Sequence, residues 1–146
     1  MAIEEDVLLS CSSPMSPLPA GCGCLSLANI DPLFARKDWK WTDHGPVEDF
    51  EYPQNAWTNY FLAALDGSLK TMDTEGAVRR RAVNCQMMVD GNVPHGAGLS
   101  SSAALVVASA LALWHVDSQR SPEIRKLDFV GEVMVYERAV GVNSGG

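Results

Sequence analysis

The segment from Ala103 to Trp114 constrains the fold of this chain more than any other segment. It predicts a helix that is apolar on every side, interrupted only by Ser109. A helix that is apolar all round has to be buried, and this one is too short to span a bilayer. The sequence therefore predicts a helix inside a globular core, which a chain of 146 residues is long enough to build.

A strand and a loop of small residues precede this helix. Apolar residues alternate with more polar ones from Val83 to Val89, which is the period of a strand with one buried face. Asp90-Gly91-Asn92 then predicts a turn, and the segment from there to Ser102 is rich in glycine and serine. A strand, a loop and a helix thus follow one another in this part of the chain.

The loop has the composition of an anion-binding site. The first four N–H groups of a helix lack internal partners and carry a partial positive charge. Gly96 and Gly98 leave room for an anion to reach these groups. Ser100, Ser101 and Ser102 add hydroxyl donors, or oxygen ligands for a hard cation. The pattern favours a phosphate-binding loop, although glycine-rich turns and serine caps also begin many helices that bind no ligand.

A carboxylate on the apolar side of the last predicted helix is the second chemical feature. We expect this helix to run from Pro122 to Ala139, with proline at its first position. Glu137 follows Val130, Val133 and Met134 at helical spacing, so it shares their face. A carboxylate there needs a cation. That cation is either Arg138 or another arginine, or a Mg²⁺ ion shared with a serine hydroxyl and nucleotide phosphates. Simple fraying near the helix end is the remaining alternative.

Another helix is predicted over residues 55–65, where the apolar residues recur on one face. Asn55 is its expected cap, and Gly67 is expected to mark its end or a weak point. The apolar residues of its predicted face are Trp57, Tyr60, Phe61, Ala64 and Leu65. By periodicity alone, Trp57 is a buried anchor of this helix.

Shorter patterns complete the predicted architecture. Asp6–Ser10 and Cys24–Ala28 predict short strands. Residues 37–45 lack a clear period, and residues 73–81 are polar and predict a loop. The order of these elements predicts an α+β fold, with helices packed on one face of a mixed sheet.

Charge, cysteine usage and the first residues exclude several classes of protein. The net charge of −7 disfavours a nucleic-acid partner. The four cysteines show neither a Cys-x-x-Cys motif nor zinc spacing, so we interpret them as reduced core thiols of a cytoplasmic protein. The acidic start lacks the features of a secretory signal. Neither a Walker A motif nor a Gly-x-Ser-x-Gly elbow occurs. We expect a soluble cytoplasmic chain without membrane partners.

Several motifs resemble those of a known family. "VDGNVPHGAGLSSSAALVVASA" resembles the second signature of the GHMP small-molecule kinases, Pro-x-x-x-Gly-Leu-x-Ser-Ser-Ala. The triple serine and "YERAVGVNSGG" are similar to the galactokinase branch, in a form typical of fungi. "MAIEEDVLL" resembles the segment just after the first galactokinase signature, and "AWTNYFLAAL" resembles the Trp-x-Asn-Tyr helix of that branch. The resemblance covers the whole chain in matching order, and its second signature is highly specific.

The resemblance implies an N-terminal GHMP kinase domain, similar to domain 2 of ribosomal protein S5, over residues 1–146. It implies transfer of the ATP γ-phosphoryl group to O1 of galactose with Mg²⁺, so ATP and galactose are the expected small-molecule partners. Ser102 and Glu137 match the metal-binding positions, Trp57 matches an aromatic near the adenine, and Ser144 and Gly145 match the sugar-side turn. The residues implied to wrap the phosphates are Pro94, Gly96, Ala97, Gly98, Leu99, Ser100, Ser101, Ser102 and Ala103.

The chain also departs from the family pattern. The family's first signature lies upstream of the segment that matches Met1, and its catalytic Asp lies in a Met-Asp-Gln motif just after the segment that matches Gly146. We therefore expect a partial, incomplete domain without the catalytic base and without the C-terminal domain. Such a chain should bind Mg·ATP weakly and should not phosphorylate sugar by itself.

Other functions stay open beside galactose phosphorylation. A close relative phosphorylates N-acetylgalactosamine, and some fungal relatives are galactose- and ATP-dependent sensors that bind a transcriptional repressor without chemistry. The known sensors are altered in the serine-alanine loop, whereas Ser100–Ala104 is intact here, which favours the kinase. A fragment that misfolds and has no activity is the remaining alternative.

Overall fold

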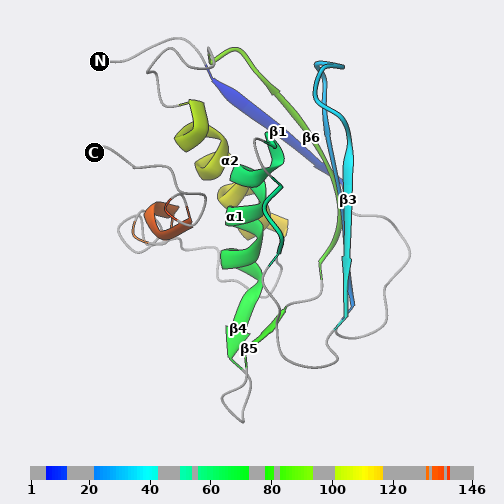
Figure 1. Cartoon of the computed structure of the whole chain (residues 1–146), viewed down its shortest axis with the longest axis vertical. Coiled ribbons are helices and arrows are strands. Elements are labelled where there is room, and N and C mark those ends of the chain that lie inside the picture. The colour runs from blue at the N-terminus through cyan, green and yellow to red at the C-terminus, as the bar shows by residue number, and fades with distance from the viewer. Residues whose placement is uncertain are drawn as a thin grey trace.

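The computed structural model of this chain describes residues 6–12, 22–42, 50–53, 56–72, 78–80, 83–93, 101–116, 131, 133–136 and 138. The elements along these residues are β1 (Val7–Ser12), β2 (Gly23–Asn29), β3 (Lys37–Trp41), α1 (Thr58–Leu69), β4 (Lys70–Met72), β5 (Val78–Arg80), β6 (Asn84–Gly91) and α2 (Ser101–Val116). Figure 1 shows their arrangement.

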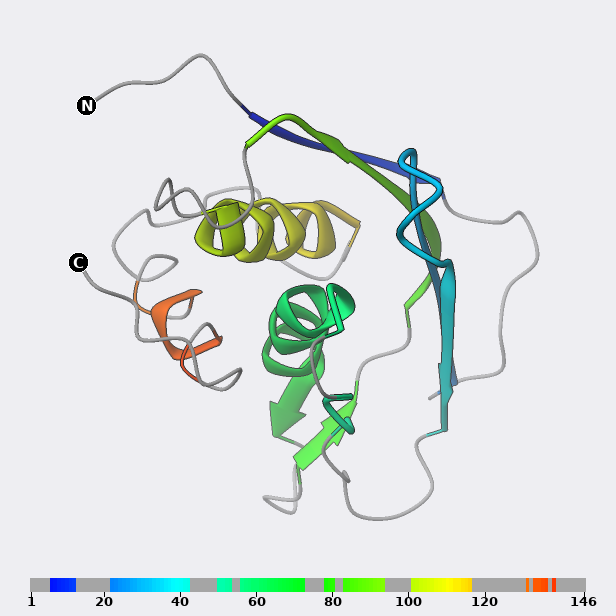
Figure 2. The same ribbon diagram turned by 45° about the horizontal axis from the view of Figure 1, so that its top comes forward.

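Four of the strands form a mixed sheet in the order β1-β6-β2-β3. β6 runs parallel to β2, whereas the β1–β6 and β2–β3 pairs are antiparallel. Both α1 and α2 cover the same face of this sheet (Figure 2), and the short β4–β5 pair stands apart at one end of the molecule. This arrangement confirms the predicted α+β fold, with helices packed on one face of a mixed sheet.

The core lies between this face of the sheet and the two helices. Leu25 of β2 pairs with Cys85 of β6, and Leu27 pairs with Met87; all four side chains are buried. Gln86 and Met88, which alternate with the buried residues of β6, are exposed, so β6 has the alternation that the sequence predicted. The largest fully buried side chains include Phe61, Leu25, Leu27, Leu62, Leu65 and Val106.

Three of the described strands, β3, β4 and β5, lie where the sequence predicted none. β3 pairs with β2 along its whole length, and β5 forms inside the segment 73–81 that was expected to be a loop. In β3, Trp39 stacks on Phe61 with ring centroids 6.1 Å apart, and Trp41 is buried. Among the described strands, β3 pairs with β2 only, and its three charged residues are exposed. Its one strand signal in the sequence was the short alternation of Trp39 and Trp41.

α1 begins at Thr58, later than expected, and residue 57 takes the N-cap position. Trp57 makes no side-chain capping hydrogen bond, and Asn55 lies outside the described residues. The Asn59 side chain instead links the first turn of the helix to the preceding segment, because its amide nitrogen Nδ2 donates to the carbonyl oxygen of Pro53 at 2.8 Å. The prediction of a helix is confirmed, and the predicted cap is wrong.

Gly67 lies inside α1, not at its end, because the helix continues to Leu69. A Cβ atom at Gly67 would lie 1.9 Å from ring carbon Cε1 of Tyr136. The glycine is therefore explained by a close approach between α1 and the last helix, not by helix termination.

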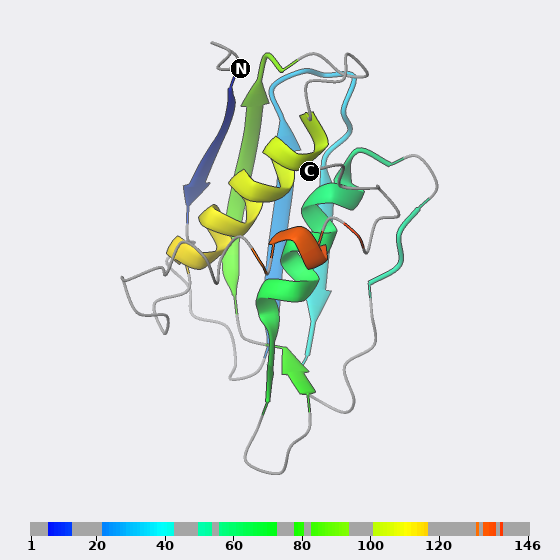
Figure 3. The ribbon, with the colours of Figure 1, turned by 90° about the vertical axis from the view of Figure 1, so that its left-hand side faces the viewer.

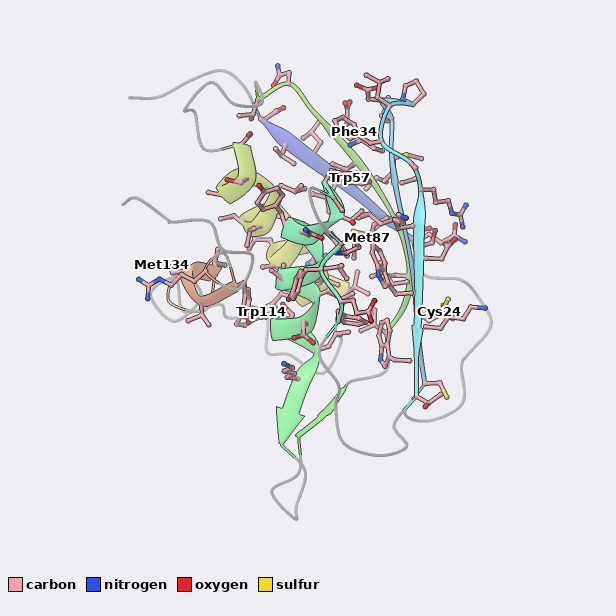
Figure 4. All side chains as sticks on the ribbon, viewed as in Figure 1. Cys24, Phe34, Trp57, Met87, Trp114 and Met134 are labelled. Carbon is pink, nitrogen blue, oxygen red and sulfur yellow. The ribbon has the colours of Figure 1, made fainter. Side chains whose placement is uncertain are left out.

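The last helix is described at residues 131, 133–136 and 138, within its predicted range. Val133 is buried, as predicted for its apolar stripe, but Met134 is exposed and points away from the sheet (Figure 4). The buried face is thus set by Val133 and by Tyr136, which packs on α1. The predicted stripe is wrong at Met134, and Glu137 lies outside the described side chains.

α2 confirms the predicted apolar helix but is buried on one side only. Val106 and Leu113 are buried, whereas Val107 and Leu111 are 37% and 42% exposed. The prediction of burial on every side is wrong, because the helix packs on the sheet with one side and exposes residues of the other side. The sequence pattern of a helix does not reveal how many layers cover it. Ser109 keeps its hydroxyl satisfied within the helix by donating to the carbonyl oxygen of Leu105 at 2.6 Å. Among the described helices, none combines the length and apolar content needed to cross a membrane.

The four cysteines are free thiols, but they do not share one environment. Cys85 is buried, Cys22 and Cys24 are half-buried and Cys11 is exposed. Burial raises the pKa of the Cys85 thiol to about 12, and the Cys11 and Cys24 thiols add to this rise. The interpretation as core thiols holds for Cys85 alone.

Candidate functional site

The described residues of the predicted site lie at one end of the molecule. The C-terminal end of β6, the N-terminal ends of α1 and α2, and the turn between β2 and β3 all lie at the upper end in Figure 3. α2 follows β6 in the chain, and the end of the strand and the start of the helix lie at the same end of the fold (Figure 3). Trp57 and Ser101–Ala103 therefore belong to the same end of the fold.

The N-terminal end of α2 has the electrostatics of an anion site. Ser101, Ser102 and Ala103 form the first helical positions, and all three are half-buried. The first turn contains no acidic residue, and His115 lies in the last turn. The partial positive charge of the helix end is therefore not opposed by a carboxylate of that turn. Backbone N–H groups and serine hydroxyls at this position are suited to phosphate oxygens.

Trp57 lies at the N-cap of α1 and has both a structural and a candidate binding aspect. Its ring is half-buried and packs against the core, as periodicity predicted. It also contacts Phe34 of the β2–β3 turn, with ring centroids 5.7 Å apart and the planes tilted by 56° (Figure 4). The indole Nε1 is buried and has no hydrogen-bond partner in the described part of the chain. An unpaired buried donor is unusual and needs a reason.

Phe34 is a residue of this end that the sequence analysis missed. The signal was present in "NIDPLF", because Asn29 and Asp31 are turn-forming residues that hydrogen-bond to nearby backbone. The Asn29 oxygen Oδ1 accepts from the Asp31 N–H at 2.9 Å, and the Asp31 oxygen Oδ1 accepts from the Leu33 N–H at 2.9 Å. These two hydrogen bonds define the turn, which places the Phe34 ring in contact with Trp57.

The structure does not place the remaining predicted site residues. Ser101, Ser102, Ala103 and Trp57 are the described members of the predicted set. Those outside the described residues are Pro94, Gly96, Ala97, Gly98, Leu99, Ser100, Glu137, Ser144 and Gly145. Within the described residues, no three His, Cys, Asp or Glu side chains are grouped closely enough to hold a metal ion.

A shallow pocket lies elsewhere, between β1 and α2. Its volume is about 390 Å³, and its lining residues are Leu9, Cys11, Ala108, Leu111, Ala112 and His115. Leu9 and Cys11 belong to β1, and the other four residues come from the middle and the C-terminal part of α2, away from the serines at its start. The pocket is therefore separate from the candidate site.

Comparison with known proteins decides the family. Residues 59–146 match the GHMP kinases N terminal domain. The chain belongs to the GHMP kinase family. Galactokinase from Candida albicans is 36% identical over 147 residues, and galactokinase from Saccharomyces cerevisiae is 30% identical over 149 residues. Both alignments cover 100% of this chain but only 27% and 28% of the relative. The chain thus spans little more than a quarter of the length of the curated relatives it matches.

Solved structures of the family share the fold. A galactokinase from Lactococcus lactis, complexed with galactose, superposes with a TM-score of 0.68 at 18% identity. The superposition covers 98% of this chain and 32% of the Lactococcus lactis chain. A mevalonate kinase gives a TM-score of 0.58 at 12% identity, over 92% of this chain and 37% of its own. The predicted GHMP kinase domain fold and the resemblance to fungal galactokinases are both confirmed.

Proposed function

We propose that this chain forms the nucleotide-binding part of a galactokinase-type sugar kinase, which transfers the γ-phosphoryl group of ATP to O1 of galactose. The observation that carries the proposal is the start of α2, where a glycine- and serine-rich segment leads into a long helix without a carboxylate in its first turn. Similarity to galactokinases of three fungi, over the whole length of this chain, supports galactose as the acceptor.

The chemistry of phosphoryl transfer fits this kind of site. The reaction needs neutralisation of phosphate charge and alignment of the reacting groups more than covalent help from the protein. In our proposal, Pro94–Ala103 wraps the phosphates, and the backbone N–H groups at the start of α2 stabilise their negative charge. Ser144 and Gly145 hold the sugar in line with the γ-phosphoryl group, which supplies the alignment.

The donor set also fits a magnesium ion. Mg²⁺ prefers hard oxygen ligands and commonly combines one or two protein oxygens with nucleotide phosphates. Ser102 offers a neutral hydroxyl oxygen in the first turn of α2, a turn that contains no carboxylate. We propose Ser102 and Glu137 as the protein ligands. When bound, the ion neutralises charge on the transferred phosphoryl group.

Titration of the ¹⁵N-labelled chain of 146 residues with Mg·ATP tests the nucleotide site. We expect the amide resonances of residues 96–102 and the indole resonance of Trp57 to shift. Ser102→Ala should lower the affinity for Mg·ATP by roughly tenfold, because it removes one oxygen next to a charged group. Ser109→Ala, in the buried middle of the same helix, is the matched control and should leave the affinity unchanged. Amide resonances that stay still at millimolar Mg·ATP would refute the site.

The acceptor is tested in a chimaera, because this chain aligns with 27% of Candida albicans galactokinase. Replacement of the aligned segment by this chain should preserve galactose phosphorylation, and Ser102→Ala in the chimaera should lower kcat/KM at least tenfold. Galactose, N-acetylgalactosamine and mevalonate are compared as acceptors. A folded chimaera that prefers either of the last two would reject galactose as the substrate.

A further inference from the structure

The Trp57 ring lacks any hydrogen bond that would fix its orientation in the described part of the chain. Its indole N–H is buried and unpartnered, and as the N-cap residue of α1 it makes no capping bond. Its orientation is therefore set by ring packing, and Phe34 supplies an aromatic contact to it, with centroids 5.7 Å apart. Tilted aromatic pairs at this separation are favourable and prefer particular orientations.

Phe34 is itself held firmly. Its own N–H donates to the carbonyl oxygen of Asp31 at 3.1 Å, and the two side-chain bonds of Asn29 and Asp31 brace the same turn. The N–H of Ile30 donates to the carbonyl oxygen of Val89 at 2.9 Å, which anchors the turn to β6. Phe34 is thus a fixed support that is tied to the strand leading into the phosphate loop.

We infer that Phe34 is a positioning residue, which sets the Trp57 ring at the angle needed to stack on the base of the nucleotide. The inference rests on the proposed function, because it assumes that Trp57 faces the adenine. It goes further in one respect: it assigns base recognition to an aromatic pair built from α1 and the β2–β3 turn. Removal of the Phe34 ring should weaken binding of the base without affecting binding of the phosphates.

The test compares Mg·ATP with Mg-tripolyphosphate, which carries the same phosphate chemistry but no base. Phe34→Ala should lower the affinity for Mg·ATP by about two- to tenfold, which is the range measured for aromatic pairs. Its affinity for Mg-tripolyphosphate should equal that of the unchanged chain. Phe34→Tyr keeps the ring and should restore ATP binding. Leu33→Ala is the matched control, since Leu33 lies in the same turn and is 86% exposed.

The indole ¹H–¹⁵N resonance of Trp57 reports the orientation directly. It should move in Phe34→Ala without nucleotide, because the ring current of Phe34 is lost, and it should stay in place in Leu33→Ala. If Phe34→Ala does not fold, Phe34→Leu, which keeps the apolar bulk but has no aromatic ring, replaces it. An indole resonance that does not move would overturn the inference.

The two proposals fail in different ways. If the unchanged chain binds neither ligand, the nucleotide site is wrong and the role of Phe34 falls with it. If the chain binds both ligands but Phe34→Ala weakens neither, the site stands and the positioning role is wrong. Equal weakening of both ligands by Phe34→Ala means general damage to the fold and also overturns the positioning role.

Discussion

Substitution of Gly67 by alanine is the sharpest test of how the last helix packs on α1. In an ordinary helix interior this change stabilises a protein by about 0.5–1 kcal/mol, because glycine loses more backbone entropy on folding. Here the new Cβ atom would lie 1.9, 2.3 and 2.7 Å from three ring carbons of Tyr136. Carbon atoms pack at about 3.5–4.0 Å, so the ring has to retreat by roughly 1.5–2 Å.

The retreat of Tyr136 costs stability. Overpacking of this kind costs about 1–3 kcal/mol, and the helix gain offsets only part of it. We expect Gly67→Ala to lower the free energy of unfolding by up to about 2 kcal/mol, measured by urea denaturation of the chain. In a Tyr136→Ala background the ring is gone, so the same substitution should become stabilising by about 0.5–1 kcal/mol. This reversal of sign is the decisive feature.

Tyr136→Phe is the matched control, because it keeps the ring and removes only the hydroxyl. Gly67→Ala should remain destabilising in that background. If Gly67→Ala stabilises the unchanged chain, the close contact between α1 and the last helix is not present in solution, and the explanation of this glycine is wrong.

Two further predictions concern titratable groups. Burial raises the pKa of the Cys85 thiol to about 12, above its unfolded value near 9, so the folded state keeps a proton that the unfolded state loses. Stability should therefore fall as the pH rises above 9. Cys85→Ala should show a smaller fall between pH 8 and pH 10 in urea unfolding, and equal falls in both chains would contradict the prediction. A hydrogen bond from Ser26, followed by the nearby Arg36, lowers the pKa of the exposed Asp38. The ionised Asp38 carboxylate therefore stabilises the folded state above its unfolded pKa, and this stabilisation is lost as the pH falls through its folded pKa. Between pH 6 and pH 3, the Asp38→Asn variant should lose less stability than the unchanged chain.

The sequence predicted the elements whose period is long or strict. β6 was predicted because its apolar residues alternate over the whole strand, and α2 because no strand would contain so long an apolar run. β3 was missed because only Trp39 and Trp41 show its period, and five residues are too few to separate alternation from chance. Which side of α2 is exposed depends on how many layers the fold has, and this information is not local to the helix.

The sequence could predict only the part of the candidate site that is formed by one continuous segment. The loop and first turn of α2 form one continuous segment, so their chemistry could be recognised from spacing. The contact between Phe34 and Trp57 joins two elements that are far apart in the sequence, and neither residue belongs to a recognisable pattern with the other. Such a contact depends on the turn between β2 and β3 and on where α1 begins, which the sequence predicted incorrectly.

One feature of the sheet explains why these distant segments meet. β2 and β6 are parallel neighbours, so their C-terminal ends lie at the same edge of the sheet. β2 continues there into the turn that carries Phe34, and β6 continues into the loop before α2. The hydrogen bond from the Ile30 N–H to the Val89 carbonyl oxygen extends the pairing past the end of β2 and ties the two exits together. In sheets with parallel strands, ligands bind beyond the carboxyl ends of such strands, where the connections diverge. This parallel pair directs an aromatic support and a helix N-terminus to one edge, which supports our proposal that the nucleotide binds there.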